Sequence, residues 1–287
     1  MTNPEITSSC LENSKLIKRI AKTLSLEIRQ FIANRHFFIA LSVHDFKAQY
    51  LGSIFGFVWS VIEPLALIGI YAAVFSFVVA PVTDMNGNQV NFGLFLFSGM
   101  LPWLAVQVSL QRGATVFVDL AHIVRHHSIP LNQLPLNIVL SATASQIMAV
   151  IAFVLIKLIS SGTISYHGIF LFFLIPLQVL FCYGMALIIA TLNVFVRDIA
   201  HLTTTVLFVW FFTSPIIFPL STLSSSMQKI MWLNPLTCLI EIYRDLMLFE
   251  RLPSLTAVMV FVGFTVFFLL FALLLFKKVE KTIVDWV

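Results

Sequence analysis

The chain has 287 residues, of which 59% are hydrophobic and only 10% are charged, and its mean hydropathy is +0.98. This composition leaves too little polar surface for one or two water-soluble domains, and it therefore indicates an integral membrane protein. The formal charge of +4 does not favour a nucleic-acid-binding protein, because the basic residues flank apolar runs and form no basic face interleaved with aromatic side chains.

The first 50 residues are expected to form a cytoplasmic N-terminal region that contains an amphipathic helix. Apolar residues recur at three- and four-residue steps from Ile17 to Phe31, while lysines and arginines occupy the other faces. A helix of this kind is suited to lie flat at the level of the lipid headgroups. We therefore expect an interfacial helix in residues 1–50 and a transmembrane domain in residues 51–287.

Six apolar stretches follow, each about as long as a helix needs to be to cross the ~30 Å of hydrocarbon. The predicted spans run from Ile54 to Ala80, Phe92 to Val118, Leu136 to Ser160, Gly168 to Leu192, Leu202 to Pro219 and Leu255 to Phe276. Most of the 17 lysines and arginines lie before the first span, in every second gap and after the last span. Because such loops stay in the cytoplasm, the pattern predicts that both termini are cytoplasmic.

A few residues inside or beside the spans depart from the apolar pattern. Glu63 precedes Pro64 deep in the first span, where a charged side chain costs roughly 2.5–3.5 kcal/mol and should face protein or water. A proton relay is one interpretation, but no second intramembrane acid completes it, and a structural role is favoured. Lys157 is expected to extend toward the headgroups. Gly52 and Gly56 form a Gly-x-x-x-Gly step, which would permit close helix contact.

Two gaps between the spans carry patterns of their own. Residues 119–135 contain a short helix-compatible cytoplasmic run with three histidines, but no cysteine or carboxylate completes a metal-ligand set, so no metal site is expected. This run is interpreted either as a basic helix that contacts a cytoplasmic partner or as a solvated turn. The external segment from Ser221 to Ser254 has apolar stripes broken by Asn234-Pro235, which predicts two short amphipathic helices that dip into the outer leaflet or cap an exit.

Aromatic residues are frequent, with 29 phenylalanines among them. A polar substrate such as a glycan can slide along aromatic faces by stacking its C–H surfaces on them. This stacking avoids the deep free-energy minima that fixed hydrogen bonds would create. The candidates for such a pathway are Trp59, Trp103, Trp210, Phe211 and Phe212. Packing or anchoring in the membrane interface is the alternative role for each of them.

Several blocks of this sequence, taken in order, carry a family resemblance. The run from His44 to Trp59, continuing through Glu63-Pro64, is similar to the first-span signature of the type-2 ABC exporter permeases that move bacterial polysaccharides. Later blocks follow in the same order and extend the resemblance to about Leu248; they are Phe97 to Trp103, Asn193 to Ile199, Ser214 to Pro219, Asn234-Pro235-Leu236 and Tyr243-Arg244-Asp245.

The resemblance implies half of a transporter in the bacterial inner membrane, with two copies of the chain paired and each bound to a separate ATPase subunit. ATP and Mg would be held by those partners, so this chain would be neither an enzyme nor the holder of a cofactor. The transported substrate would be a polyprenyl-linked glycan such as O antigen, capsule or teichoic acid, with O antigen favoured. The matching residues are Ile123, Val124, Arg125 and His126 for coupling to the ATPase, and Asn234, Pro235 and Arg244 for an external gate.

One feature of the sequence supports this division of labour independently. The chain contains no Gly-x-x-x-x-Gly-Lys-Ser/Thr loop, so we expect ATP hydrolysis on a partner chain. A secondary transporter remains an alternative, although it would need intramembrane ion-binding groups beyond Glu63 and an internal repeat. An integral-membrane acyl- or glycosyltransferase is a further alternative, which would need clustered acids or histidines at one membrane face.

Overall fold

The computed structural model describes residues 40–50, 52–75, 90–121, 131–161 and 166–286. The chain divides into two units, Met1–Leu41 and Ser42–Val287. Of the first unit only residues 40 and 41 are described, and both are helical. The amphipathic helix expected before residue 40 therefore lies outside the described residues.

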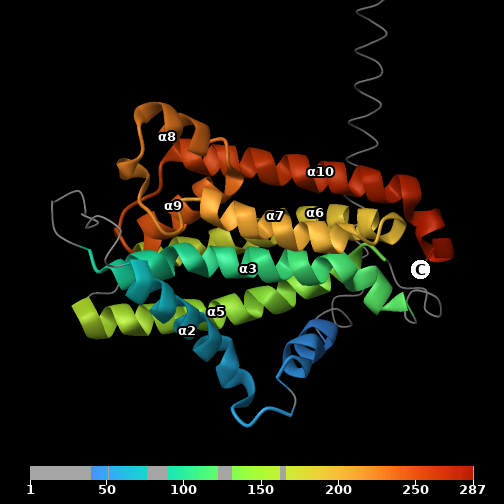
Figure 1. The fold of residues 1–287 in the computed structure, drawn as a ribbon, viewed down its shortest axis with the longest axis horizontal. Coiled ribbons are helices and arrows are strands. Elements are labelled where there is room, and N and C mark those ends of the chain that lie inside the picture. Colours follow the sequence, from blue (N-terminus) through green and yellow to red (C-terminus); the bar gives the residue numbers. More distant parts are fainter. Residues whose placement is uncertain (1–39, 51, 76–89, 122–130, 162–165, 287) are drawn as a thin grey trace, which may run out of the picture. The chain divides into compact units, whose positions relative to one another are not determined.

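All regular elements in the described part of the second unit are helical, which confirms the all-α prediction for those residues. After a helical segment that reaches residue 48, they are η1 (Gly56–Val58), α2 (Trp59–Phe75), α3 (Phe92–Asp119), α5 (Gln133–Ser161), η2 (Tyr166–Phe170), α6 (Leu171–Phe195), α7 (Ile199–Thr213), η3 (Leu220–Thr222), α8 (Ser225–Met231), α9 (Pro235–Met247) and α10 (Leu255–Trp286) (Figure 1). A helix satisfies its backbone polar groups within one segment, and apolar surroundings require this because they offer no water.

Four helical segments are long and apolar enough to cross a membrane, namely Phe92–Asp119, Gln133–Ile159, Tyr166–Phe195 and Leu255–Ile283. Two shorter apolar helices, α2 and α7, coincide with the first and fifth predicted spans. The two short helices predicted on either side of Asn234-Pro235 are also present, as α8 and α9. All six apolar stretches therefore contain a helix, and four of these helices have the full length of a crossing.

Two helix ends differ from the sequence predictions. The fifth stretch was expected to reach Pro219, but α7 ends at Thr213 because Pro215 restricts the preceding Ser214 to an extended conformation, with ψ at 151°. The last helix continues ten residues beyond Phe276, through a lysine-rich segment that contains no proline or glycine to end it. Gly52 and Gly56 have φ angles of 80° and 52° and would meet no atom within 4 Å. Gly52 lies in a turn and Gly56 begins η1, so the two residues share no face of α2, and the close helix contact expected of them stays a prediction.

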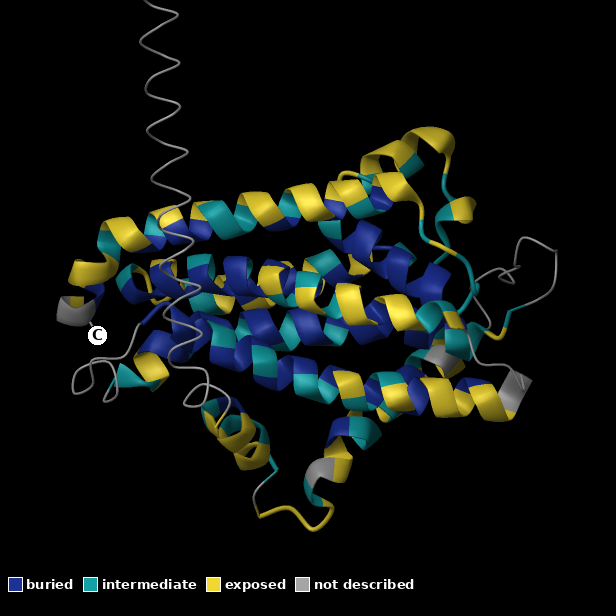
Figure 2. Ribbon diagram, turned by 180° about the vertical axis from the view of Figure 1, so that it is seen from behind, coloured by how far each residue is buried: buried dark blue, intermediate teal, exposed yellow. Residues whose placement is uncertain are grey.

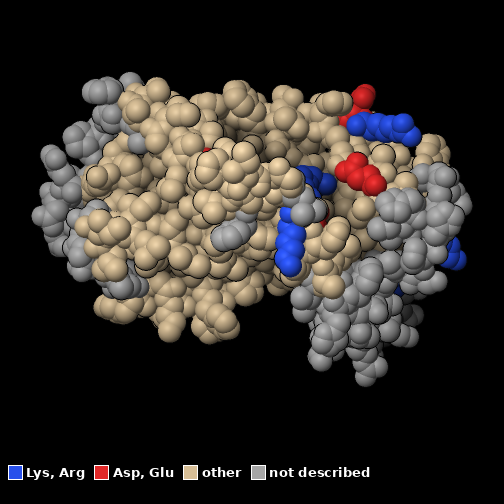
Figure 3. All heavy atoms as spheres, turned by 90° about the horizontal axis from the view of Figure 1, so that it is seen from below, with Lys and Arg blue, Asp and Glu red and all other residues tan. Residues whose placement is uncertain are grey.

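Helix α3 is the central element of the bundle. It contacts α2, α5, α6, α7 and α9, and 78% of its most apolar window is buried, compared with 22% for α10. Figure 2 shows the same contrast, with long exposed stretches along α10 at the top of the bundle and more buried residues on the helices below it. Figure 3 shows a face that is almost uncharged over one half, with charged side chains gathered toward the other end. An apolar exposed belt of this kind is what a lipid-facing surface requires.

Small residues set the closest helix contacts. A Cβ atom added at Gly184 in α6 would lie 2.9 Å from the backbone nitrogen of Leu269 in α10. A Cβ atom at Gly113 in α3 would lie 2.9 Å from the Cβ atom of Ala186 in α6. Because the backbones approach this closely, α6 is held tightly between α3 and α10.

We expect Gly184→Ala to destabilise the bundle by about 1–3 kcal/mol, because the added methyl group meets rigid backbone rather than a flexible side chain. The matched control is Gly263→Ala in α10, where nothing lies within 4 Å and the substitution should be neutral or stabilising by up to ~1 kcal/mol. Thermal unfolding of both variants in the same detergent measures the difference. Equal unfolding temperatures would contradict the proposed α6–α10 contact.

Candidate functional site

An aromatic groove of about 230 Å³ lies between α2, α3 and α7. Its lining consists of Leu67, Tyr71, Met100, Trp103, Leu104, Gln107, Gln111, Thr204, Phe208, Phe211 and Phe212. The ring of Phe211 is the centre of the cluster, since its centroid lies 5.5 Å from that of Tyr71 and 5.5 Å from that of Trp103. The polar lining residues lie closer to the end of α3 and the start of α7; they are Gln107, Gln111 and Thr204. One part of the groove is therefore lined by aromatic rings and the other by amides and a hydroxyl.

Three of the five aromatic pathway candidates line this groove, namely Trp103, Phe211 and Phe212. Trp210 lies beside it, with its ring edge-to-face against that of Trp103 at 6.5 Å. Trp59 lies at the start of α2 against Phe55, at a ring distance of 5.9 Å, and is not among the lining residues. The groove thus unites residues from three helices that are far apart in the sequence.

The expected gate residues Asn234 and Pro235 form the start of α9 and connect it to α7. The Asn234 Oδ1 atom accepts a hydrogen bond from the backbone N–H of Leu236 at 3.0 Å, and another from Trp210 Nε1 at 2.9 Å. Its Nδ2 atom donates to Ser214 Oγ at 3.0 Å. Pro235 occupies the first helical position, where its missing N–H costs no hydrogen bond. Asn234 therefore caps α9 and also joins it to the end of α7.

The third expected gate residue, Arg244, is fully buried in the last turn of α9. Its Nη1 atom donates to Glu241 Oε1 at 2.8 Å and its Nη2 atom donates to the Ile216 carbonyl at 2.7 Å. The guanidinium also lies over the Phe95 ring, 3.7 Å from its centroid, in a cation–π contact. Burial lowers the pKa of Arg244, and the neighbouring Glu241 carboxylate raises it. The Glu241–Arg244 ion pair therefore lies inside the protein rather than at its surface.

Gly99 in α3 provides the space for this guanidinium. A Cβ atom at Gly99 would lie 2.9 Å from Arg244 Nη2 and 3.3 Å from the Ile216 carbonyl oxygen. Any larger residue at this position would displace the hydrogen bond that joins α9 to the segment after α7. Gly99 belongs to the same sequence block as Trp103, and it therefore supports both the groove and α9.

A buried polar network holds α9 against α3, α5 and α6. The Tyr243 hydroxyl donates to Gln178 Oε1 at 2.7 Å and accepts from Gln146 Nε2 at 2.9 Å. Gln146 Nε2 also donates to Gln178 Oε1 at 3.1 Å, and Gln178 Nε2 donates to the Pro102 carbonyl at 3.3 Å. This network was not predicted from the sequence. Isolated glutamines in otherwise apolar spans were the available signal, because such a residue requires a partner in hydrocarbon.

The C-terminal end of α9 is bonded as well. Lys157 Nζ donates to the Met247 carbonyl at 2.7 Å and pairs with Glu250 Oε1 at 2.7 Å. The expectation that Lys157 extends toward the headgroups was wrong: the side chain is buried and satisfies a carbonyl that the last helical turn leaves free. Asp245 accepts from Arg251 Nε at 2.6 Å. Burial raises the pKa of the Asp245 carboxyl, whereas the hydrogen bond from Arg251 opposes that shift.

The expected coupling residues Ile123, Val124, Arg125 and His126 lie outside the described residues. The preceding end of α3 is described, and there the Thr115 hydroxyl donates to Asp119 Oδ2 at 2.6 Å. Arg112 Nη2 pairs with Asp45 Oδ1 at 2.7 Å. These contacts place charged and polar groups where α3 ends, next to the expected coupling segment.

Comparison with known proteins identifies the family. Residues 36–248, most of the chain, match the model of the ABC-2 type transporter family. The chain belongs to that family. It is therefore a multi-pass membrane protein and the transport component of an ABC system, in agreement with the family resemblance found in the sequence.

Two relatives carry more specific names. The O-antigen export system permease protein RfbA of Myxococcus xanthus is 27% identical over 253 residues, which cover 88% of this chain and 95% of the relative. A protein of the same name from Klebsiella pneumoniae is 27% identical over 209 residues, covering 72% of this chain and 78% of the relative. The similarity to both relatives thus extends over most of their length.

We expect Tyr243→Phe to lower the free energy of unfolding by about 1–2 kcal/mol, because it removes the hydroxyl that joins Gln146 to Gln178 and leaves buried amides underbonded. Tyr166→Phe is the matched control, since Tyr166 is 77% exposed. Thermal or chemical unfolding in detergent compares the two variants. Indistinguishable stabilities would mean that the network does not hold α9 in place.

Proposed function

We propose that this chain is the channel-forming permease subunit of an ATP-driven exporter that moves lipid-linked O antigen, or a similar cell-surface polysaccharide, across the bacterial inner membrane. The observation that carries the proposal is the aromatic groove between α2, α3 and α7 in a chain of the ABC-2 type transporter family. The names of the two RfbA relatives support O antigen as the transported substrate.

The lining of the groove suits a glycan. Sugar rings present apolar C–H faces and polar rims, and aromatic side chains such as Trp103 and Phe212 can bind the former with modest strength. The amides of Gln107 and Gln111 can exchange hydrogen bonds with the hydroxyl rims. A polymer that must keep moving requires many weak contacts of this kind rather than one strong site.

We further propose that two copies form the channel. Among the residues of α7 only Thr203, Leu207 and Phe211 are buried, so most of this helix faces outward from the single chain. Phe208 is 66% exposed and Phe212 is 46% exposed, although both line the groove. A second copy facing α7 would close the groove into a conduit, which one chain cannot do with this surface.

The proposed topology has six crossings and two cytoplasmic termini. The short helices α2 and α7 would complete their crossings together with adjoining segments, such as η1 before α2 and the Pro-rich turn after α7. The lysines at 277, 278 and 281 in the last turns of α10 favour a cytoplasmic end for that helix. With this topology, α8 and α9 lie on the external side, where the polymer leaves.

ATP hydrolysis is assigned to two separate ATPase subunits, which hold ATP and Mg, while this chain holds no cofactor. The segment with Ile123, Val124, Arg125 and His126 is proposed to contact those subunits. Residues 1–50 are proposed as a cytoplasmic region with an interface helix, and residues 51–287 as the transmembrane domain. Motion of the ATPases would then reach α3 and α5, the two helices that flank the coupling segment.

We expect proteoliposomes that contain this chain together with its ATPase partner to accumulate lipid-linked glycan only when ATP is supplied. Replacement of residues 123–126 by serine should abolish the glycan-linked ATP hydrolysis while leaving insertion and folding unchanged. Transport by the chain alone under an ion gradient would contradict the proposal and favour a secondary transporter.

We expect Phe212→Leu to slow export severalfold at unchanged protein levels, because the leucine keeps apolar bulk but removes the aromatic face in the groove. Phe172→Leu is the matched control, since Phe172 is 76% exposed in α6 and lies outside the groove lining. Initial rates of glycan accumulation in the same proteoliposomes measure the effect. Equal export rates for both variants would contradict the proposal that the groove lies on the export pathway.

A further inference from the structure

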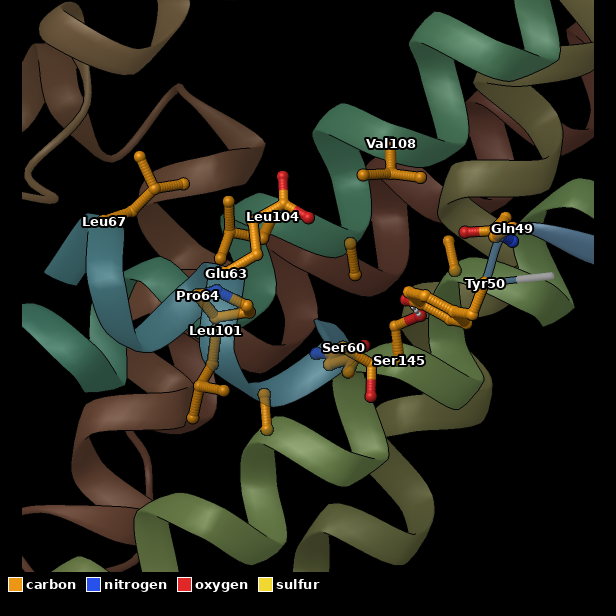
Figure 4. Close-up of a pocket in the computed structure, with 14 residues that line it drawn as sticks. Gln49, Tyr50, Ser60, Glu63, Pro64, Leu67, Leu101, Leu104, Val108 and Ser145 are labelled. Atoms are coloured by element: carbon orange, nitrogen blue, oxygen red, sulfur yellow. Dashed lines mark hydrogen bonds between the residues drawn. The ribbon is translucent and has the colours of Figure 1, made fainter. Parts of the chain in front are cut away.

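A second hollow, of about 120 Å³, lies on the other side of α2, where that helix meets α3 and α5. Its volume is well above the ~10–15 Å³ that one water requires. Figure 4 shows Glu63 and Pro64 on one side of the hollow and Gln49, Tyr50 and Ser145 on the other. Leu101, Leu104 and Val108 of α3 supply apolar lining. The hollow therefore combines a carboxylate, neutral polar groups and an apolar wall.

Glu63 is the unexplained group in this hollow. No hydrogen bond or ion pair to its carboxylate occurs within the part of the chain that the structure describes, and the residue is exposed in the single chain. It lies one turn into α2, whose surroundings in a bilayer are apolar. Placing a charged carboxylate in hydrocarbon costs free energy, so water or a polar ligand must fill the hollow when the chain is in the membrane.

The opposite side of the hollow is held in place by the protein itself. The Tyr50 hydroxyl lies 3.5 Å from Ser145 Oγ, and Gln49 Nε2 donates to Ser141 Oγ at 2.8 Å. Gln146, also a lining residue, is fixed by its bonds to Gln178 and Tyr243. The polar groups therefore form a preorganised surface rather than a set of mobile side chains.

We infer that this hollow binds the neutral, hydroxyl-bearing sugar of the glycan that the chain exports. A carboxylate accepts strong hydrogen bonds from a pair of sugar hydroxyls, while serine and tyrosine hydroxyls can either donate or accept. The negative charge of Glu63 disfavours a phosphate group, so the hollow selects the sugar rather than the pyrophosphate of a lipid carrier. The inference rests on the proposed function, and it adds a sugar site distinct from the aromatic groove.

Thiol protection in the complete permease–ATPase complex tests this site. In a Cys10→Ser background, Ser145→Cys places a thiol in the hollow, and Ile147→Cys places one on the exposed face of the same helix. The probe is lipid-free oligosaccharide released by mild acid from the host's own surface polysaccharide. We expect it to slow methanethiosulfonate modification of the Ser145→Cys thiol and to leave the Ile147→Cys thiol unaffected.

The carboxylate is tested by combining Glu63→Gln with Ser145→Cys. Loss of the charge-assisted bonds should raise the oligosaccharide concentration needed for half-protection by about tenfold. Glu63→Asp should recover most of the protection, and Glu280→Gln, on the exposed end of α10, should resemble the parent. Equal protection in the Glu63→Gln and parent backgrounds would overturn the inference, as would efficient disulfide formation between two Glu63→Cys chains, which would place Glu63 at a contact between copies.

The outcomes also separate this inference from the proposed function. If the parent complex exports glycan but the oligosaccharide does not protect the Ser145→Cys thiol, the sugar site is wrong and the exporter assignment stands. If the parent complex, supplied with ATP and its partner, exports no glycan, the proposed function itself fails.

Discussion

The constraint on which this structure depends is that polar groups carried into an apolar bundle must find their partners inside the protein. Helix α9 illustrates it best, because it contains Glu241, Arg244 and Asp245 yet has 11 of its 13 residues buried. Asn234 bonds its start to α7, Tyr243 bonds its middle to α5 and α6, and Lys157 bonds its end. Each bond satisfies a polar group that would otherwise be buried without a partner. The contacts that offset the cost of burying these groups therefore also fix the position of α9.

This anchoring limits which parts of the molecule can move during transport. Displacing α9 would break the Arg244 hydrogen bond to the Ile216 carbonyl and its contact with the Phe95 ring, and would leave a buried guanidinium with Glu241 of the same helix as its remaining partner. Helix α2 packs less continuously against its neighbours, since it lines the hollow toward α5 and also the groove toward α7. Opening of a path is therefore less costly at α2 and α7 than at α9, which in the proposed topology would form a fixed external rim rather than a moving flap.

The sequence was sufficient for the helices but not for the contacts between them. Apolar length and Asn234-Pro235 located the spans and the break between α8 and α9, because both are local properties of the chain. The end of α7 was misplaced by six residues because apolar character continues past Ser214, while backbone geometry does not. The inward direction of Lys157 and the Gln146–Gln178–Tyr243 network depend on residues more than 30 positions apart, and no local pattern reports such pairings.

The two hollows beside α2 differ in a way that suits different stages of moving a polymer. The groove toward α7 is dominated by rings such as Phe211 and Trp103, which in the proposed function would bind every sugar face weakly and let the polymer slide. The hollow toward α5 has a single carboxylate and fixed hydroxyls, which favour one orientation of one sugar. Leu67 and Leu104 line both, so a shift of α2 that widens one hollow must alter the other. A shift of α2 could thereby transfer a sugar from the hollow toward α5, which would hold it, to the aromatic groove toward α7, where it could slide, while α9 stays in place.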